Sequence, residues 1–301
     1  MQWKESIVEI KKLFQENHVV YSYEIFPPKV DSPLERVYDT IGELAGMQPD
    51  YISVTYGAGG SAQNNRTTRL TGRIRKRYGV ESLAHLTCIG ATKQHIDRTL
   101  DELQAHSVRN VLALRGDIPG SGFDPQDFSN SQELIRYVKG RGFGVAAAAY
   151  PEGHAETKVK DKDIEILKWK EEAGADYFIT QLFFDNERFY EFMDKVMKKG
   201  IGAPVQAGVM PITKARQIKR VVELSGASLP ESFLRMIDRY GHDEAALRDA
   251  GIAYATEQIS SLIAAGARGI HLYTMNDASV AGAVTRNIDS LIRAVNGKEA
   301  M

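Results

Sequence analysis

The segment VVYSYEIFPPKV, residues 19–30, begins the pattern that decides the fold. Its β-branched and aromatic residues predict a strand, and the Pro-Pro pair at 27–28 ends it because a proline nitrogen cannot donate to a β-ladder. Side chains alternate along a strand, so Glu24 shares a face with Ser22. If that face points into a barrel mouth, the carboxyl group is partly shielded from water and can act as a proton donor.

Runs of the same character recur along the whole chain, separated by segments with helical periodicity. In one of these segments Thr92 is a predicted N-cap, and after another Gly174 is a predicted helix stop. The predicted strands are Val19–Phe26, Tyr51–Tyr56, Leu83–Ile89, Val108–Leu114, Gly144–Tyr150, Tyr177–Phe184, Pro204–Met210 and Gly269–Met275. Eight strand–helix units favour a (β/α)8 TIM barrel, with a doubly wound open sheet as the alternative architecture.

The segment 211–267 is too long for one crossover between strands. Three parts of it look helical: residues 212–226, 228–241 and 243–267. We therefore expect extra helices before the last strand. Since no flexible linker interrupts the pattern, residues 1–301 are expected to form a single barrel domain.

The composition excludes several classes of function. The formal charge of −1 provides no overall field to recruit nucleic acid or an anionic membrane. The single cysteine, Cys88, cannot form an intramolecular disulfide or hold an iron–sulfur cluster, so redox chemistry would need an organic cofactor. The start of the chain indicates an amphipathic helix and neither a signal peptide nor a membrane span, so we expect a cytoplasmic protein.

Polar side chains gather at or just after the predicted strand ends, where a barrel builds its active site. Each has a structural alternative: His85 and Gln181 could be satisfied core residues, and Arg115 with Asp117 could be a structural ion pair. Their coincidence at one end of the barrel favours a site. The strand-end groups are Glu24, Thr55, Tyr56, His85, Thr87, Arg115, Asp117, Tyr150, Glu152, His154, Gln181, Asp185, Tyr273, Thr274 and Asn276.

Short motifs for other chemistries are missing from the sequence. It contains no Walker A motif, no G-x-G-x-x-G opening a helix, no H-E-x-x-H and no G-x-S-x-G. The seven histidines do not have the spacing of metal ligands, so no metal is expected.

The motifs YEIFPP, SVTYGAGG, HLTCI, ALRGD, AAYPEGH, ITQLFFD and LYTMN occur in this order along nearly the whole chain. In this respect the sequence resembles the bacterial methylenetetrahydrofolate reductases. The resemblance implies a flavin-containing barrel of one-carbon metabolism and methionine biosynthesis. One site would take hydride from NADH or NADPH onto FAD and then reduce 5,10-methylenetetrahydrofolate to 5-methyltetrahydrofolate, in a ping-pong sequence.

The resemblance also implies roles for single residues. Glu24 would be the general acid that helps to open the imidazolidine ring of the folate. Asp117 would be catalytic and substrate-binding, stabilising the pterin cation and tuning the flavin. Gln181 would contact both nicotinamide and folate, Gln217 would contact folate, and Thr55 would contact the nucleotide.

The FAD positions implied by the resemblance come from several strand ends and from one helix. Arg115 and Lys170 suit a diphosphate, and Asp163 suits a ribose. The complete set is Tyr56, Ala58, His85, Arg115, Gly116, Asp117, Ser129, Tyr150, His154, Asp163 and Lys170.

Four positions depart from the family pattern. Ile166 and Trp169 replace an Asn and an Arg of the FAD-binding helix, which puts FAD affinity in question. Asp277 replaces an Arg that would favour an anionic folate tail, so another basic group would have to bind that tail. Val221 replaces an aromatic residue that packs on ligand.

Two other functions remain open from the sequence. One is a methyltetrahydrofolate-binding barrel that transfers a methyl group to a corrinoid protein and needs no flavin. The other is a non-catalytic binding barrel, which would have little use for Glu24 and Asp117 together. A reduced partner protein is an alternative electron donor, and we expect a homo-oligomer without nucleic-acid partners.

Overall fold

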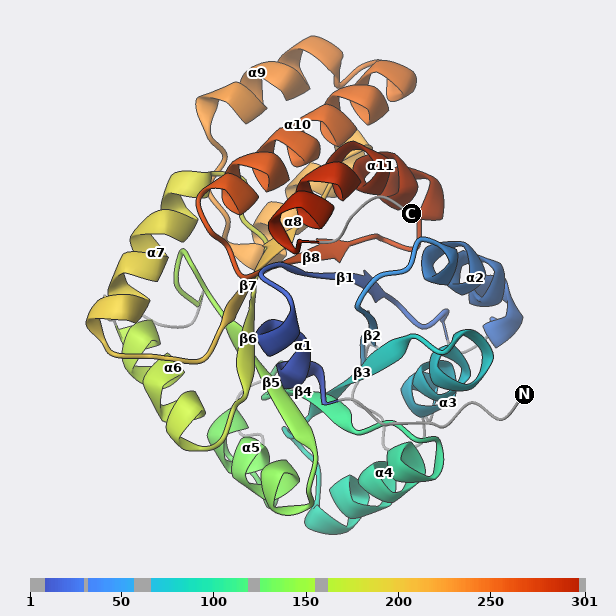
Figure 1. The fold of residues 1–301 in the computed structure, drawn as a ribbon, viewed down its shortest axis with the longest axis vertical. Coiled ribbons are helices and arrows are strands. Elements are labelled where there is room, and N and C mark those ends of the chain that lie inside the picture. Colours follow the sequence, from blue (N-terminus) through green and yellow to red (C-terminus); the bar gives the residue numbers. More distant parts are fainter. Residues whose placement is uncertain (1–8, 30–31, 57–65, 119–124, 155–161, 298–301) are drawn as a thin grey trace.

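Eight parallel strands close into a barrel in chain order, from β1 to β8 (Figure 1). The computed structural model describes residues 9–29, 32–56, 66–118, 125–154 and 162–297. The strands are β1 (Val20–Ile25), β2 (Tyr51–Val54), β3 (Glu81–Thr87), β4 (Asn110–Leu114), β5 (Gly144–Ala149), β6 (Tyr177–Thr180), β7 (Val205–Val209) and β8 (Gly269–Tyr273). Direct pairing of β1 with β8 confirms the (β/α)8 prediction and excludes the open sheet.

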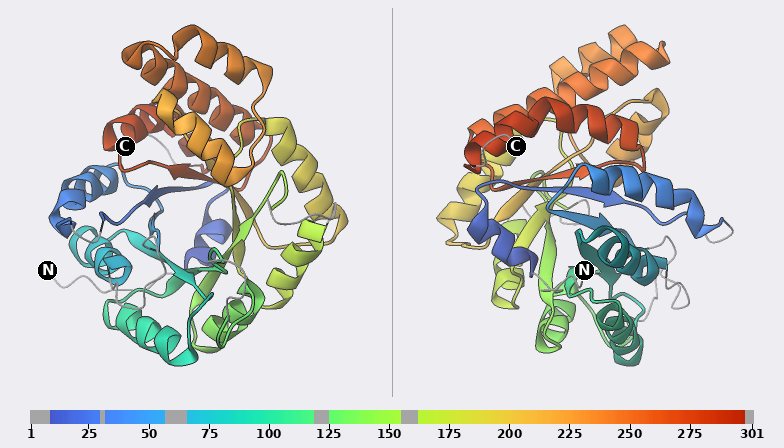
Figure 2. Two further views of the ribbon diagram at one scale, coloured as in Figure 1. Left: turned by 180° about the vertical axis from the view of Figure 1, so that it is seen from behind. Right: turned by 45° about the vertical axis from the view of Figure 1, so that its right-hand side comes forward.

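Helices cover the outside of the barrel, and one of them, α1, lies over one of its ends (Figures 1 and 2). They are α1 (Ile10–Glu16), η1 (Leu34–Val37), α2 (Tyr38–Gly46), α3 (Arg66–Arg73), η2 (Ile74–Tyr78), α4 (Lys93–Ala105), α5 (Ser131–Gly140), α6 (Lys162–Glu172), α7 (Asn186–Lys198), α8 (Ala215–Ser225), α9 (Glu231–Tyr240), α10 (Glu244–Ala264) and α11 (Ala278–Val295). The Thr92 hydroxyl accepts from the His95 amide, which confirms Thr92 as the N-cap of α4. Gly174 follows α6 with φ +109°, a conformation that favours glycine and confirms the predicted stop.

Alternation along the strands separates two cores. Outward-facing residues such as Tyr23 and Ile25 pack against the surrounding helices. Inward-facing Val20 belongs to a second cluster that fills the lower part of the barrel, together with Ile10 and Phe14 of α1. Helix α1 therefore covers the amino-terminal end of the barrel, and the site must lie at the opposite end.

The predicted extra helices before the last strand are present as α8, α9 and α10. Helix α10 packs along α11 and completes the outer ring, whereas α9 projects from one side of the barrel (Figures 1 and 2). The Phe184 and Phe233 rings pack in a tilted arrangement with centroids 4.4 Å apart and join α9 to the barrel. This arrangement places the additional chain beside the carboxyl ends of β6, β7 and β8.

Several predicted strands are one or two residues too long, and the one that begins at Tyr177 is too long by four. The run from 177 to 184 is extended only as far as Thr180, and the apolar residues beyond it are buried for another reason. Phe183 packs on Phe189 of α7, with ring centroids 5.4 Å apart. Asp185 is the N-cap of α7 and accepts from the Glu187 amide. The shorter strand places Gln181 in a loop, where its side chain can reach a cavity.

Candidate functional site

A cavity of about 630 Å³ opens at the carboxyl ends of β1, β6, β7 and β8, and we refer to it as the Glu24 cavity. It brings together Glu24, Gln181 and Gln217, which lie far apart in the sequence. Val221 of α8 also lines it and is only 8% exposed. Its lining residues are Glu24, Phe26, Gln181, Leu182, Met210, Pro211, Thr213, Lys214, Arg216, Gln217, Arg220, Val221, Ser225, Tyr273, Thr274, Met275, Asp277 and Val280.

Glu24 lies at the floor of this cavity and is 6% exposed. Its Oε2 is 3.4 Å from His85 Nε2 and 3.4 Å from His271 Nε2. Burial lowers the pKa of His85 to about 4, and His271 adds to this while Glu24 opposes it. His85 is therefore neutral at physiological pH, so it does not form an ion pair with Glu24.

A chain of buried polar groups lies beneath Glu24. The Tyr51 hydroxyl donates to Gln206 Oε1 at 2.6 Å. Gln206 Nε2 donates to Ser22 Oγ at 2.8 Å, and Ser22 Oγ is 2.7 Å from His271 Nδ1. The chain reaches from the apolar lower part of the barrel to the carboxylate.

Helix α8 forms one wall of the Glu24 cavity. Gln217 Oε1 accepts from the Thr213 amide at 3.1 Å and from the Lys214 amide at 2.9 Å, which holds the side chain at the start of the helix. Lys214, Arg216 and Arg220 line the same wall and are exposed. Within the part of the chain that the structure describes, no ion pair is found for these three cations, so the wall carries net positive charge.

Asp277 has a structural role at the edge of this cavity. It is the N-cap of α11, where its Oδ1 accepts from the Val280 amide at 3.1 Å and from the Ser279 hydroxyl at 2.7 Å. Burial raises its pKa, but these two donors and the charge of Arg248 outweigh that effect and lower it below the usual value. The carboxylate is therefore kept charged by the helix end.

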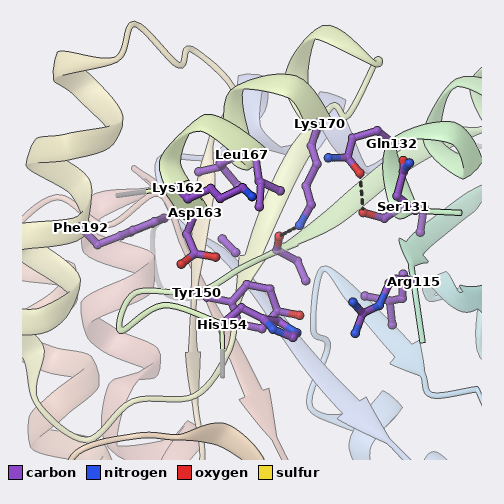
Figure 3. A pocket seen from close by; sticks show the side chains of 16 residues that line it. Arg115, Ser131, Gln132, Tyr150, His154, Lys162, Asp163, Leu167, Lys170 and Phe192 are labelled. Carbon is purple, nitrogen blue, oxygen red and sulfur yellow. Dashed lines mark hydrogen bonds between the residues drawn. The ribbon is translucent and has the colours of Figure 1, made fainter. Parts of the chain in front are cut away.

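A second cavity, of about 450 Å³, lies between β4, β5, α5 and α6, and we refer to it as the Lys170 cavity (Figure 3). The Tyr150 and His154 rings meet edge to face, with centroids 4.7 Å apart. Its lining residues are Ala113, Leu114, Arg115, Asn130, Ser131, Gln132, Ala148, Ala149, Tyr150, His154, Lys162, Asp163, Ile166, Leu167, Lys170 and Phe192.

Lys170 is the most deeply buried charged group of this cavity, at 6% exposure. Its ammonium donates to the Ala148 carbonyl at 2.7 Å and lies 5.6 Å from the centroid of the Tyr150 ring. Burial lowers the pKa of Lys170 to about 8, the Asp163 carboxylate opposes this, and Arg115 adds to it. A bound anion stabilises the charged form of such a lysine, because the anion offsets the free-energy cost of burying the ammonium group.

The turn after β4 requires its glycine. Gly116 has φ +89°, and a Cβ added there would lie 2.9 Å from Ile89 Cγ2. The Arg115 Nε donates to the Gly116 carbonyl at 3.1 Å. A larger residue at 116 would therefore clash with Ile89 and strain the turn that carries Arg115.

Several predicted site residues lie outside both cavities. Thr55 is half-buried after β2, and the Tyr56 hydroxyl pairs with His95 Nε2 at 3.1 Å. Asp117 and Ser129 are exposed, and the Ser129 amide donates to Glu133. Ala58 lies outside the described residues. The structure leaves the roles of these residues as predictions.

Sequence reasoning missed residues of both cavities. It also missed His271, which lines neither cavity and lies beneath Glu24. The spacing of His271 from Tyr273 on β8 is the sequence signal for its inward side chain. The cations of α8 gave no sequence signal of a binding site, because basic residues on a helix usually form a solvated face. Ser131 and Gln132 line the Lys170 cavity in place of the predicted Ser129.

The described residues contain neither a metal-binding cluster nor a membrane-spanning helix. Among them there is no group of three or more His, Cys, Asp or Glu side chains placed to hold a metal ion. In the same ranges, no helix combines the length and hydropathy that crossing a membrane requires.

A family model described as methylenetetrahydrofolate reductase matches residues 9–289. The chain belongs to the methylenetetrahydrofolate reductase family. It is therefore an enzyme, an oxidoreductase that reduces methylenetetrahydrofolate. The match covers the whole barrel, including β1 with Glu24 and β8 with His271.

Curated members of the methylenetetrahydrofolate reductase family match over most of the chain. The 5,10-methylenetetrahydrofolate reductase of Escherichia coli K12 is 32% identical over 268 residues, which cover 89% of this chain and 90% of that protein. The enzyme of Pectobacterium carotovorum is 31% identical and covers 89% of each chain. Methylenetetrahydrofolate reductase (NADH) 1 of Arabidopsis thaliana is 31% identical, and the match covers only 48% of it.

Solved structures with low sequence identity share the fold of this reductase. An uncharacterized protein from Clostridium thermocellum, described as binding two copies of 5-methyl-5,6,7,8-tetrahydrofolic acid, superposes with a TM-score of 0.63 at 13% identity, covering 94% of this chain and 100% of that one. A 2,3-dimethylmalate lyase superposes with a TM-score of 0.55 at 11% identity, covering 97% of this chain and 86% of that one. At these identities the similarity shows the barrel alone.

Proposed function

We propose that this reductase uses bound FAD to pass hydride from NADH or NADPH to 5,10-methylenetetrahydrofolate, in two half-reactions at one site. The observation that carries the proposal is the Glu24 cavity, in which a buried carboxyl group lies below two glutamines and a cationic wall. A folate has a polar ring system at one end and an anionic tail at the other. The Glu24 cavity offers groups in the same order: the carboxyl and the glutamines suit the ring system, and the cations at α8 suit the tail.

The Lys170 cavity supports the flavin part of the proposal. Arg115, Lys162 and Lys170 converge on it, and cations of this kind suit a diphosphate. Asp163 on the same wall can accept hydrogen bonds from ribose hydroxyls. When bound, a flavin supplies the hydride chemistry that the side chains of this protein cannot supply.

Two departures from the family pattern affect the Lys170 cavity differently. Ile166 lines it with an apolar side chain beside Leu167 and Phe192. Trp169, also on α6, is 46% exposed and is not part of the lining. The anionic part of the cofactor is therefore held by Arg115, Lys162 and Lys170, without help from positions 166 and 169.

Glu24 performs the proton step in the proposed mechanism. Its carboxyl group donates a proton to the ring nitrogen of methylenetetrahydrofolate as the imidazolidine ring opens, which leaves a carboxylate on the cavity floor. Gln181 and Gln217 provide amide groups that orient the folate above it. Asp117, at the turn after β4, is proposed to stabilise the cationic form of the substrate.

The remaining assignments follow the family pattern. Thr55 and Gln181 are proposed to contact the nicotinamide nucleotide. The cofactor set is proposed to include Tyr56, Ala58, His85, Arg115, Gly116, Asp117, Ser129, Tyr150, His154, Asp163 and Lys170. We further propose that the chain acts as a single catalytic domain and as a homo-oligomer in the cytoplasm.

An anaerobic visible spectrum tests the proposal. The purified protein, reconstituted with FAD, is mixed first with NADH and then with methylenetetrahydrofolate. We expect the flavin absorbance to bleach with the donor and to return with the folate. A protein that binds no flavin after reconstitution would instead favour the corrinoid methyltransferase alternative. Bleaching by a reduced protein but not by NADH or NADPH would reassign the donor.

A further inference from the structure

His271 is a buried titratable group that the proposed mechanism does not use. It lies on β8 and is 0% exposed. Its ring stacks on Tyr51, with centroids 6.0 Å apart, and meets Tyr273 edge to face at 5.3 Å. Burying an imidazole costs free energy unless its nitrogens find partners, so the identity of those partners indicates its role.

The amide of Gln206 fixes the direction of the hydrogen bonds below His271. Its Nε2 donates to the carbonyls of Val20 and Ile270, at 3.1 Å and 3.0 Å, and these acceptors determine which end of the amide is nitrogen. The same Nε2 is 2.8 Å from Ser22 Oγ, so its two hydrogens have three acceptors within reach. Because an amide nitrogen cannot accept a hydrogen bond, the Ser22 hydroxyl hydrogen is directed away from Gln206.

The Ser22 hydroxyl has two acceptors within reach. His271 Nδ1 is 2.7 Å away, and the Ile270 carbonyl is 3.5 Å away. If Nδ1 carried the hydrogen, the buried Ser22 hydroxyl would have only the Ile270 carbonyl at 3.5 Å, which is long for an O–H···O bond. The donation is therefore assigned to Nδ1, so Nδ1 of the neutral ring carries no hydrogen. The hydrogen of the ring then sits on Nε2, which faces Glu24 Oε2 at 3.4 Å and Ser53 Oγ at 3.4 Å.

We propose that His271 is a positioning residue that donates from Nε2 to the Glu24 carboxylate, with its tautomer fixed by Ser22 and Gln206. This inference rests on the proposed role of Glu24. After Glu24 has given its proton to the substrate, the new carboxylate is left in a buried site. The Nε2–H group stabilises that charge without itself losing a proton, which lowers the barrier to the proton step.

The other ionisable groups around Glu24 do not replace this contact. His85 Nε2 is equally close at 3.4 Å but has no hydrogen-bond geometry toward the carboxylate. The Tyr273 hydroxyl donates to the Thr180 carbonyl, and the Tyr51 hydroxyl donates to Gln206. Among the described groups near Glu24, His271 has both ring nitrogens in polar contacts.

The tautomer is tested directly by nitrogen NMR of the full-length chain labelled at histidine, with the His271 signal assigned by its loss in His271→Asn. We expect hydrogen on Nε2 in the wild type and a shift toward the Nδ1–H form in Ser22→Ala. Hydrogen on Nδ1 in the wild type, or no change in Ser22→Ala, would overturn the proposed direction. This measurement is decisive whether or not the protein reduces folate.

The effect on Glu24 is tested by a matched pair of variants in the flavin-reconstituted enzyme. Glutamine can place an amide N–H near the position of Nε2, whereas asparagine is too short. In His271→Asn we expect the folate half-reaction to slow about tenfold more than the donor half-reaction, and in His271→Gln we expect most of that loss to be restored. Equal slowing of both half-reactions, or no rescue by glutamine, would mean a merely structural role. A wild type that the folate cannot reoxidise would instead contradict the proposed function.

Discussion

Glu24 owes its position to a single alternation along β1. Val20 below it packs in the lower core, and Ser22 lies one step nearer the mouth. The neighbouring Tyr23 and Ile25 face the helices. A shift of register by one residue would point the carboxyl group into the apolar outer core, so Glu24 reaches the cavity only in the observed register.

Glu24→Gln removes the proton and keeps the shape of the side chain. We expect FAD binding and reduction by NADH to persist while the folate half-reaction falls at least about 100-fold, the usual contribution of a general acid. Stopped-flow absorbance measures the two half-reactions separately. Glu187→Gln, on the exposed face of α7, is the control. Native folate reduction in Glu24→Gln would exclude the proton-donor role.

Lys170 predicts a pH dependence of cofactor binding. Its pKa is lowered to about 8, so the charge that attracts a diphosphate is present below pH 8 and is lost as the pH rises above it. Between pH 7 and pH 9 we expect FAD affinity to fall about tenfold, because the free lysine deprotonates while the bound one does not.

Lys170→Met is expected to bind FAD weakly at pH 7 and to show little further change up to pH 9. Fluorescence titration of FAD measures both affinities. Lys168→Met is the matched control on α6, since Lys168 pairs with Glu171 at 2.6 Å, away from the cavity. A wild-type affinity that stays constant to pH 9 would mean that Lys170 does not contact the anionic part of the cofactor.

At the scale of elements, we propose that α8 binds the anionic tail that the family pattern assigns to the loop after β8. Asp277 in that loop is committed to capping α11, and its negative charge does not favour an anionic tail. Lys214, Arg216 and Arg220 face the same cavity from the opposite element. Helix α8 is therefore our candidate for the element that binds the carboxylates of a folate.

Arg216→Gln combined with Arg220→Gln should raise the KM for methylenetetrahydrofolate about threefold to tenfold, since each exposed ion pair contributes up to about 1 kcal/mol. The increase should be larger for a substrate with additional glutamates and smaller at high salt. Steady-state kinetics at two ionic strengths measures it. Lys219→Gln is the control, because Lys219 pairs with Glu223 on α8 and does not line the cavity. Equal KM changes in the double variant and the control would remove α8 from substrate binding.

At the scale of the whole molecule, the buried polar interior of the barrel lowers the stability of the folded protein in acid. His85 is buried and neutral, with a pKa of about 4 in the folded chain against an ordinary value of 6.5. The unfolded chain therefore binds more protons between pH 6.5 and pH 4. By linkage, the free energy of unfolding decreases as the pH falls through this window.

We expect this one residue to account for up to about 3 kcal/mol of acid destabilisation. Urea unfolding at pH 7, 5.5 and 4.5 measures the effect. His85→Gln should be less sensitive to pH over this range than the wild type, while His18→Gln, whose side chain is exposed, should match the wild type. Identical pH dependence in His85→Gln and the wild type would show that another group controls acid stability.

The sequence by itself determined the barrel, its eight strands, the helices added before β8 and the direction in which Glu24 points. These features follow from local patterns: a period of two in strands, a period near 3.6 in helices, and glycine, proline and capping residues at their ends. The family and its reaction were also accessible, because its motifs occur in order along the chain.

The tertiary structure alone decided which side chains meet. His271 lies 247 residues from Glu24 in the sequence and contacts it because β1 and β8 pair to close the barrel. The Lys170 cavity combines β4, β5 and α6, and the cationic wall of α8 faces Asp277 across the Glu24 cavity. Such contacts have no local signature, since barrel closure and helix packing act between segments that are far apart in the chain.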